Sequence, residues 1–246
     1  MAVDLQECLK ALRLPTVRDC YADMAETARM ESHSYEQYLE EVLEREREER
    51  RRKRIERLLR ISKLPLEKSL DSFDRKRLPP KVGAQLSVLL DGGFLDRKEN
   101  VLAFGNPGSG KTHLLCAIGQ ELVYQGRKVL FHHCDLLVQE LLLAKDQLRL
   151  AALLKKLSRY EALIIDDIGY VQQSREEMEV LFTLLAHRYE RGSVMLTSNL
   201  PFSEWEKIFK DPMTTAAAID RLVHHSVIIE LNLPSYRLSA AKGAIK

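Results

Sequence analysis

The 246-residue chain is long enough for one α/β domain of ordinary size and a small second domain. Its net charge of +2 points to no partner, but 30% of the residues are charged and they are unevenly distributed. No apolar run is long enough to span a bilayer, and the charged start does not resemble a signal peptide. The four cysteines lack Cys-x-x-Cys spacing, which argues against a zinc site or a disulfide framework. We expect a soluble intracellular protein.

Residues 1–64 are expected to form a small all-α domain. A first short apolar stripe consists of Leu5, Leu9 and Leu12. A second amphipathic helix follows Pro15, with apolar residues at the spacing i, i+4, i+7 and i+11. These residues are Val17, Tyr21, Met24 and Ala28. Ser34 and Gln37 fit a capping box at the start of the next helix. The apolar residues that we expect to face inward from that helix are Tyr35, Leu39, Val42 and Leu43.

The same helix carries no apolar residue over positions 44–54. On a helical projection, one arc of about 120° collects five arginines, while the glutamates fall elsewhere. This arginine stripe consists of Arg47, Arg50, Arg51, Arg54 and Arg57. A stripe of this kind suits a nucleic-acid backbone or another partner. The alternative is that pairs such as Glu46–Arg50 and Glu49–Lys53 merely stabilise an exposed helix.

A linker marked by proline and glycine begins near residue 65 and is followed by one expected helix, residues 81–91. Phe73 in this linker lies either beside the adenine of a bound nucleotide or in an ordinary core contact. From residue 101, strand and helix patterns alternate to the end of the chain. The expected strands are residues 101–104, 128–132, 162–166, 193–198 and 227–231, with two helices within 135–158. This alternation predicts an α/β domain over residues 65–246, with a five-stranded parallel sheet covered on both faces.

The strongest motif is an apolar strand that runs into G-x-x-x-x-G-K-T and is followed by a helix over residues 113–125. Glycines allow successive backbone N–H groups to wrap a phosphate, and the helix N-terminus favours an anion. Lys111 supplies a cation to the phosphates, and Thr112 supplies a hydroxyl to Mg²⁺. The motif therefore predicts a nucleoside triphosphate. The residues expected to contact it are Gly105, Asn106, Pro107, Gly108, Ser109, Gly110, Lys111, Thr112 and His113.

Polar side chains end two of the expected strands. Asp166 and Asp167 end the strand that starts at residue 162, where a carboxylate meets the ligand crevice of a parallel sheet. We expect Asp166 to hold the Mg²⁺ hydration shell and Asp167 to orient or deprotonate the attacking water. Asn199 ends the strand 193–198. If that strand lies between the other two, Asn199 faces the γ-phosphate; otherwise it is a turn residue.

Two arginines late in the chain are further candidates. Arg221 lies on a helix from which it can reach the nucleotide of a neighbouring subunit, unless it only pairs with an acid such as Asp220. Arg237 is a candidate to act on the nucleotide of its own subunit. The histidine pairs 132–133 and 224–225 are not assigned to a metal, because adjacent residues on a strand point to opposite faces.

With these residues assembled, the sequence resembles the AAA+ ATPases of the DnaC/IstB clade, and most closely the IstB-like helper ATPases of bacterial insertion sequences. The resemblance covers nearly the whole chain. Besides the P-loop and Asp166-Asp167, it is carried by Leu12–Thr16, Arg188–Ser193, Leu196–Phe202, Asp220–His225 and Ser235–Arg237.

The resemblance implies an ATP-hydrolysing AAA+ domain in which Asn199 is sensor I, Arg221 is the arginine finger and Arg237 is sensor II. The helices within 135–158 are then an initiator-type insertion, which in relatives lines a DNA-binding channel. It also implies a bacterial cytoplasmic protein that forms an ATP- and DNA-dependent homo-oligomer on duplex DNA and recruits its cognate transposase. The arginine stripe becomes a DNA or transposase contact.

The sequence departs from the AAA+ pattern at two places. Asp167 stands where most of these proteins have glutamate, which predicts slow or partner-dependent hydrolysis. The chain ends fifteen residues after position 231, so we expect the reduced lid of this clade. A DnaC-like helicase loader and an ATP-switched DNA-binding protein with incidental hydrolysis are the alternative functions. A GTPase is disfavoured because the chain contains no Asn-Lys-x-Asp.

Overall fold

The structure is a computed structural model that describes residues 4–169, 174–209 and 211–236. The chain divides into two units, Met1–Arg57 and Leu58–Lys246. The division falls inside helix α3 (Tyr35–Ser62), before the expected boundary at residue 64. Leu58 already belongs to the apolar core of the second unit. None of the helices in the described residues has the length and apolar character needed to cross a membrane.

The first unit contains α1 (Leu5–Ala11), α2 (Pro15–Met30) and the first part of α3. Its small core is formed by Leu9, Val17 and Val42. The capping box at the start of α3 is confirmed: Gln37 N–H donates to the Ser34 hydroxyl at 3.2 Å, and Ser34 N–H donates to the Gln37 side chain at 2.8 Å.

The predicted inward face of α3 is wrong at three of its four positions. Tyr35, Leu39 and Leu43 are exposed, whereas Tyr38 and Val42 face the core. The next residue on the inward face, at the i+4 spacing from Val42, is Glu46, which is only 3% exposed. Its carboxylate accepts hydrogen bonds from the N–H groups of Thr16 and Val17, at 2.8 and 3.1 Å.

Glu46 therefore caps the first turn of α2 from another helix, because those N–H groups have no partner within α2. Arg50 completes the contact by donating to Glu46 at 2.6 Å and also to the Arg13 carbonyl oxygen. Burial raises the pKa of Glu46, but the hydrogen bonds from Arg50, Val17 and Thr16 outweigh it and hold the pKa below its usual value of 4.5. The predicted Glu46–Arg50 pair is thus confirmed, and it serves the packing of the first unit.

Glu46→Gln should raise the rate of amide hydrogen exchange in the first turn of α2. A glutamine accepts weaker hydrogen bonds than a carboxylate, so we expect local stability to fall by about 1.5–3 kcal/mol at pH 7. Because the folded-state pKa is lowered, this stabilisation is fully present above pH 4.5 and is lost as the pH falls through the folded-state value. Hydrogen exchange with mass spectrometry measures the effect. Glu48→Gln, at an exposed position of the same helix, is the control; equal exchange in both variants would contradict the cap.

The second unit is built on one parallel sheet with strand order β2-β3-β4-β1-β5. The strands are β1 (Asn100–Gly105), β2 (Val129–His133), β3 (Ala162–Ile168), β4 (Ser193–Ser198) and β5 (Ser226–Leu231). The predicted five-stranded parallel sheet is confirmed. Because β4 lies between β3 and β1, the strand that ends near Asn199 occupies the position required for a site residue.

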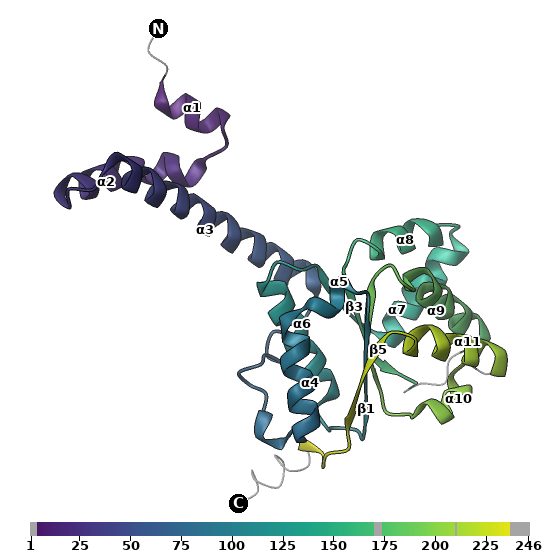
Figure 1. Ribbon diagram of the computed structural model, residues 1–246. Coiled ribbons are helices and arrows are strands. Elements are labelled where there is room, and N and C mark those ends of the chain that lie inside the picture. The colour runs from purple at the N-terminus through teal and green to yellow at the C-terminus, as the bar shows by residue number, and fades with distance from the viewer. Residues whose placement is uncertain (1–3, 170–173, 210, 237–246) are drawn as a thin grey trace, which may run out of the picture. The chain divides into compact units, whose positions relative to one another are not determined.

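Helices cover both faces of this sheet (Figure 1). One face packs against α4 (Pro80–Asp91), α5 (Gly93–Asp96) and α6 (Lys111–Tyr124). The other packs against α7 (Cys134–Asp146), α8 (Leu150–Leu157), α9 (Arg175–Arg188), α10 (Glu206–Phe209) and α11 (Pro212–Val223). Short 3₁₀ turns occur at Arg75–Arg77 and Phe202–Glu204. The two helices predicted within residues 135–158 correspond to α7 and α8.

Arg188 at the end of α9 is a buried structural clamp, with only 2% of its surface exposed. Its guanidinium donates to four backbone carbonyl oxygens, those of Leu157, Tyr160, Glu161 and Ser193, at 2.9–3.1 Å. Desolvation lowers its pKa to about 10. These contacts fix the connections that lead into β3 and β4.

Candidate active site

The P-loop takes the backbone conformation that its glycines predict. It connects the end of β1 at Gly105 to the start of α6 at Lys111. Gly105 has φ 146°, and a Cβ there would lie 2.2 Å from the Leu231 carbonyl oxygen of β5. Gly110 has φ 100°, so both motif positions require glycine.

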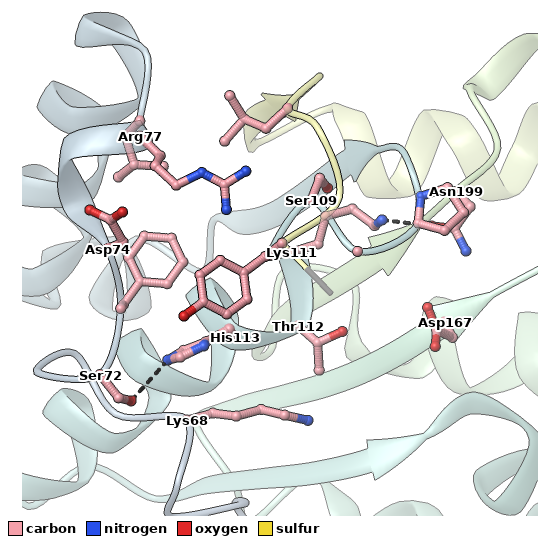
Figure 2. A pocket seen from close by; sticks show the side chains of 17 residues that line it. Lys68, Ser72, Asp74, Arg77, Ser109, Lys111, Thr112, His113, Asp167 and Asn199 are labelled. Carbon is pink, nitrogen blue, oxygen red and sulfur yellow. Dashed lines mark hydrogen bonds between the residues drawn. The ribbon is translucent and has the colours of Figure 1, made fainter. Parts of the chain in front are cut away.

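Lys111 is 5% exposed and is held by three oxygens. Its Nζ donates to the carbonyl oxygens of Gly105 and Asn106, at 2.9 and 3.0 Å, and to Asn199 Oδ1 at 2.6 Å. The last contact joins the P-loop to the end of β4, as Figure 2 shows. The structure therefore brings together two of the residues that the sequence singled out, 88 positions apart.

A cavity of about 430 Å³ lies beside the P-loop. The sequence predicted part of its lining: Pro107, Gly108, Ser109, Gly110, Lys111, Thr112, His113, Asp167 and Asn199. The opposite wall comes from the linker before α4 (Figure 2) and contains Lys68, Ser72, Phe73, Asp74, Arg77 and Leu78. Leu233 and Tyr236, which follow β5, complete the lining. Gly105 and Asn106 are not part of the lining; their carbonyl oxygens hold Lys111 instead.

The two carboxylates at the end of β3 are placed differently. The pairing between β3 and β4 shifts between Ile165 and Ile168, and Asp167 takes the left-handed conformation with φ 60°. Its N–H donates to the Thr197 hydroxyl at 2.8 Å, and that hydroxyl donates to Asp166 at 2.7 Å. An irregularity of this kind changes the direction in which a side chain at the end of a strand points. Asp167 lines the cavity, whereas Asp166 is 3% exposed and is not among the lining residues.

Phe73 makes the core contact that was one of its two expected roles, and its place in the cavity lining is compatible with the other. It lines the cavity and also packs against the core between the sheet and α4 to α6. Its ring meets the His113 ring edge-on, with centroids 5.1 Å apart. His113 is fixed by Ser72 at 3.2 Å and by the Ser69 carbonyl oxygen at 2.9 Å.

Sequence reasoning missed Arg77 and Tyr236. The Arg77 guanidinium lies over the Tyr236 ring at 5.4 Å and donates to the Pro234 carbonyl oxygen at 2.7 Å. Tyr236 N–H donates to the Gly108 carbonyl oxygen at 2.9 Å. The segment after β5 is thereby tied to the P-loop. Tyr236 could have been found, because it belongs to the Ser235–Arg237 segment that carried the family resemblance. No sequence signal pointed to Arg77. Arg237 itself lies outside the described residues.

Arg221 lies far from the cavity beside the P-loop of its own chain. It lines a separate cavity with Asn100, the first residue of β1, whereas the P-loop starts at the other end of that strand. At ~3.3 Å per residue, the strand separates the two cavities by about 16 Å. The Arg221 guanidinium donates to the Ala217 carbonyl oxygen at 2.8 Å and lies over the Phe182 ring at 5.1 Å.

A parallel sheet in the order β2-β3-β4-β1-β5 with a P-loop after β1 is the arrangement of the AAA+ fold. The solved structure of the DnaC helicase loader is similar, with a TM-score of 0.59 at 16% identity over 68% of this chain and 97% of that one.

The chain belongs to the family of IstB-like ATP binding proteins, whose sequence pattern matches residues 7–244. A Sinorhizobium fredii protein named as an insertion sequence ATP-binding protein is 43% identical over 96% of this chain and 80% of its own length. A Geobacillus stearothermophilus protein named for ATP binding in insertion sequence IS5376 is 38% identical over 95% of this chain and 93% of its own length.

Proposed function

We propose that this protein is an ATP-dependent helper of transposition that assembles on duplex DNA as a homo-oligomer and recruits or regulates its transposase. One observation carries the proposal. In a chain whose relatives are named as insertion sequence ATP-binding proteins, Lys111, Asn199 and Asp167 converge on a single cavity.

In this proposal the cavity binds ATP with Mg²⁺. The P-loop N–H groups and Lys111 hold the phosphates, and Phe73 and His113 lie on the wall available to the base. The Thr112 hydroxyl, which lines the cavity, would bind Mg²⁺. Asp166 lies behind the cavity lining and accepts a hydrogen bond from Thr197, so its carboxylate would hold water of the ion's hydration shell. When bound, Mg²⁺ neutralises the charge that develops on the phosphates.

Asp167 and Asn199 are proposed to act on the attacking water. Asp167 reaches the cavity with a shorter side chain than glutamate, which favours slow hydrolysis that a partner stimulates. The hydrogen bond from its N–H to the Thr197 hydroxyl supports its left-handed backbone. Asn199, already hydrogen-bonded to Lys111, senses the γ-phosphate when the lysine turns toward it.

Arg221 is proposed to complete the site of a neighbouring subunit. Since about 16 Å of strand separates it from its own P-loop, it cannot act within its own chain. A head-to-tail assembly places the Arg221 edge of one subunit against the P-loop edge of the next.

DNA binding is proposed to use the arginine stripe. Arg50 is engaged with Glu46 and Arg13, and Arg47 pairs with Glu44. The variant therefore replaces Arg51, Arg54 and Arg57, which are exposed. Replacing these three residues with glutamine should weaken binding to duplex DNA. It should also reduce the slope of log K against log salt by up to about 0.9 for each lost phosphate contact. Fluorescence anisotropy with ATP over a salt series measures both quantities.

The matched control removes three positive charges from the rest of the same helix: Arg45, Arg52 and Lys53, also replaced with glutamine. Arg52 pairs with Glu49 and Glu56, and Lys53 pairs with Glu49, so the predicted Glu49–Lys53 pair is confirmed. Exposed pairs of this kind contribute little to stability. If the two triple variants lose the same affinity and slope, the stripe is only an ion-paired, solvated helix.

The partner distinguishes a transposition helper from a helicase loader. A transposase encoded beside this gene should bind the ATP-loaded protein, whereas the replicative helicase of the same cell should not. Selective capture of the helicase instead would favour the loader.

A further inference from the structure

Glu190, His224 and His225 form a cluster at the edge of the sheet where its strands begin. One ligand atom from each residue lies within 4.8 Å of the others, and all three residues are exposed. In the described part of the chain, no other group of three or more histidine, cysteine, aspartate or glutamate residues meets this geometry. The cluster is distinct from the nucleotide cavity, none of whose lining residues it shares.

The local backbone explains why these side chains meet. Glu190 lies in the connection between α9 and β4, with φ 56°. His224 and His225 lie in the turn between α11 and β5, not on a strand, and their ring centroids are 4.1 Å apart. The expectation that this pair points to opposite faces is therefore wrong. The rule that adjacent strand residues point to opposite faces does hold for residues 132–133 of β2, where His132 is buried and His133 is exposed.

The ligand atoms of the cluster suit a divalent ion of intermediate softness such as Zn²⁺. Two imidazoles and one carboxylate are ligands that Zn²⁺ takes in sites with a further open position. The Tyr189 hydroxyl lies 2.9 Å from His224 Nδ1. If Nδ1 carries the proton and donates to this oxygen, Nε2 is left as the ligand atom. Partners of this kind orient metal-binding histidines.

Two of the three positive charges nearby are engaged with groups outside the cluster. Glu190 and His225 also line the cavity of about 190 Å³ that contains Arg97, Lys98 and Arg221. Arg97 is paired with Glu99 through two hydrogen bonds, at 2.8 and 2.9 Å. Arg221 is turned onto the Phe182 ring and the Ala217 carbonyl oxygen.

We propose that Glu190, His224 and His225 bind Zn²⁺ through one carboxylate oxygen and two imidazole nitrogens. The ion joins the connection before β4 to the turn after α11, three residues beyond Arg221. It thereby fixes the end of the helix that presents this arginine. Zinc binding does not depend on the proposed function, because it needs neither nucleotide nor DNA.

The test uses the full chain, freed of metal by chelation and without nucleotide. Titration calorimetry with Zn²⁺ should give one site per chain. His225→Ala and Glu190→Gln should each weaken it at least tenfold, and Tyr189→Phe by about 10-fold, the lower range for outer-shell partners. His187→Ala, which removes a histidine of α9 outside the cluster, should leave it unchanged. Zn²⁺ should also raise the melting temperature of the wild type but not of His225→Ala.

Co²⁺ provides an independent readout, because visible absorption bands report coordination directly. The wild type should show them, and His225→Ala should lose them while retaining the wild-type circular dichroism spectrum. Unchanged Zn²⁺ affinity in both His225→Ala and Glu190→Gln would overturn the proposal. So would a wild-type protein that binds no Zn²⁺ at micromolar concentration.

Discussion

Replacing Lys111 with alanine should weaken ATP binding by about 100-fold or more and abolish ATP-dependent assembly on DNA. A lysine that contacts phosphate makes charge-assisted hydrogen bonds worth ~1.5–3 kcal/mol each, and every 1.4 kcal/mol is a tenfold change in affinity. The nearly buried Lys111 already lies among oxygens at the P-loop, so little reorganisation is needed to reach the nucleotide. Titration with a fluorescent ATP analogue measures the affinity.

Lys81→Ala is the control for this experiment, because Lys81 is an exposed lysine of α4 outside the cavity lining. It should bind ATP like the wild type. Circular dichroism shows whether Lys111→Ala remains folded despite losing its contact with Asn199. Affinity within about threefold of the wild type in a folded Lys111→Ala protein would contradict the assignment of the P-loop.

Replacing Arg221 with alanine should leave ATP binding by one protomer near normal while hydrolysis by the assembly falls by about 10³–10⁵, the range measured for arginine fingers. The reason is geometric: Arg221 lies at the opposite end of β1 from the P-loop, away from the nucleotide cavity of its own chain, so we propose that it acts on a neighbour's site. Single-turnover hydrolysis on duplex DNA, together with nucleotide titration, separates the two effects.

The control for Arg221 is Arg97→Ala, which removes another arginine from the same small cavity. Arg97 is paired with Glu99, so its loss should change hydrolysis little. Equal loss of binding and hydrolysis in Arg221→Ala would argue against an arginine that acts across a subunit interface.

The sheet could be predicted from the sequence because its strands are continuous apolar runs separated by helical patterns. Burial on both faces makes such runs conspicuous, and all five strands occur within about two residues of the expected positions. The strand order was not readable from periodicity. A position of β4 between β3 and β1 was stated only as the condition for Asn199 to reach the site, and the observed order satisfies it.

The first unit was harder to predict because a charged residue occupies its core. Apolar periodicity placed Tyr35, Leu39 and Leu43 inward, whereas the face that packs includes Glu46. A buried carboxylate is stable there only because two helix N–H groups and Arg50 satisfy it. The two N–H groups lie about thirty residues away along the chain, so no local rule identifies them. Only Arg50, four residues along the same helix, was predicted as a partner of Glu46.

Site residues that belong to sequence motifs were predicted, whereas site residues that are positioned only by tertiary contacts were missed. The P-loop, Asp167 and Asn199 were found from sequence and meet at one cavity. Arg77 could not be found, because a basic residue in a linker resembles any solvated one until the fold places it over Tyr236. A motif residue can also have a structural role. Arg188 belongs to a segment that carried the family resemblance, yet its guanidinium donates to four backbone carbonyl oxygens.

The shared active site is tested most directly by mixing two inactive variants. Asp167→Asn should bind ATP without hydrolysing it, and Arg221→Ala should lack the arginine that acts on its neighbour. In a random equal mixture, about one head-to-tail interface in four pairs an intact Asp167 with an intact Arg221. ATP hydrolysis on duplex DNA should therefore recover to a substantial fraction of the wild-type rate. A mixture that remains as inactive as its two components would contradict a site completed by the neighbouring subunit.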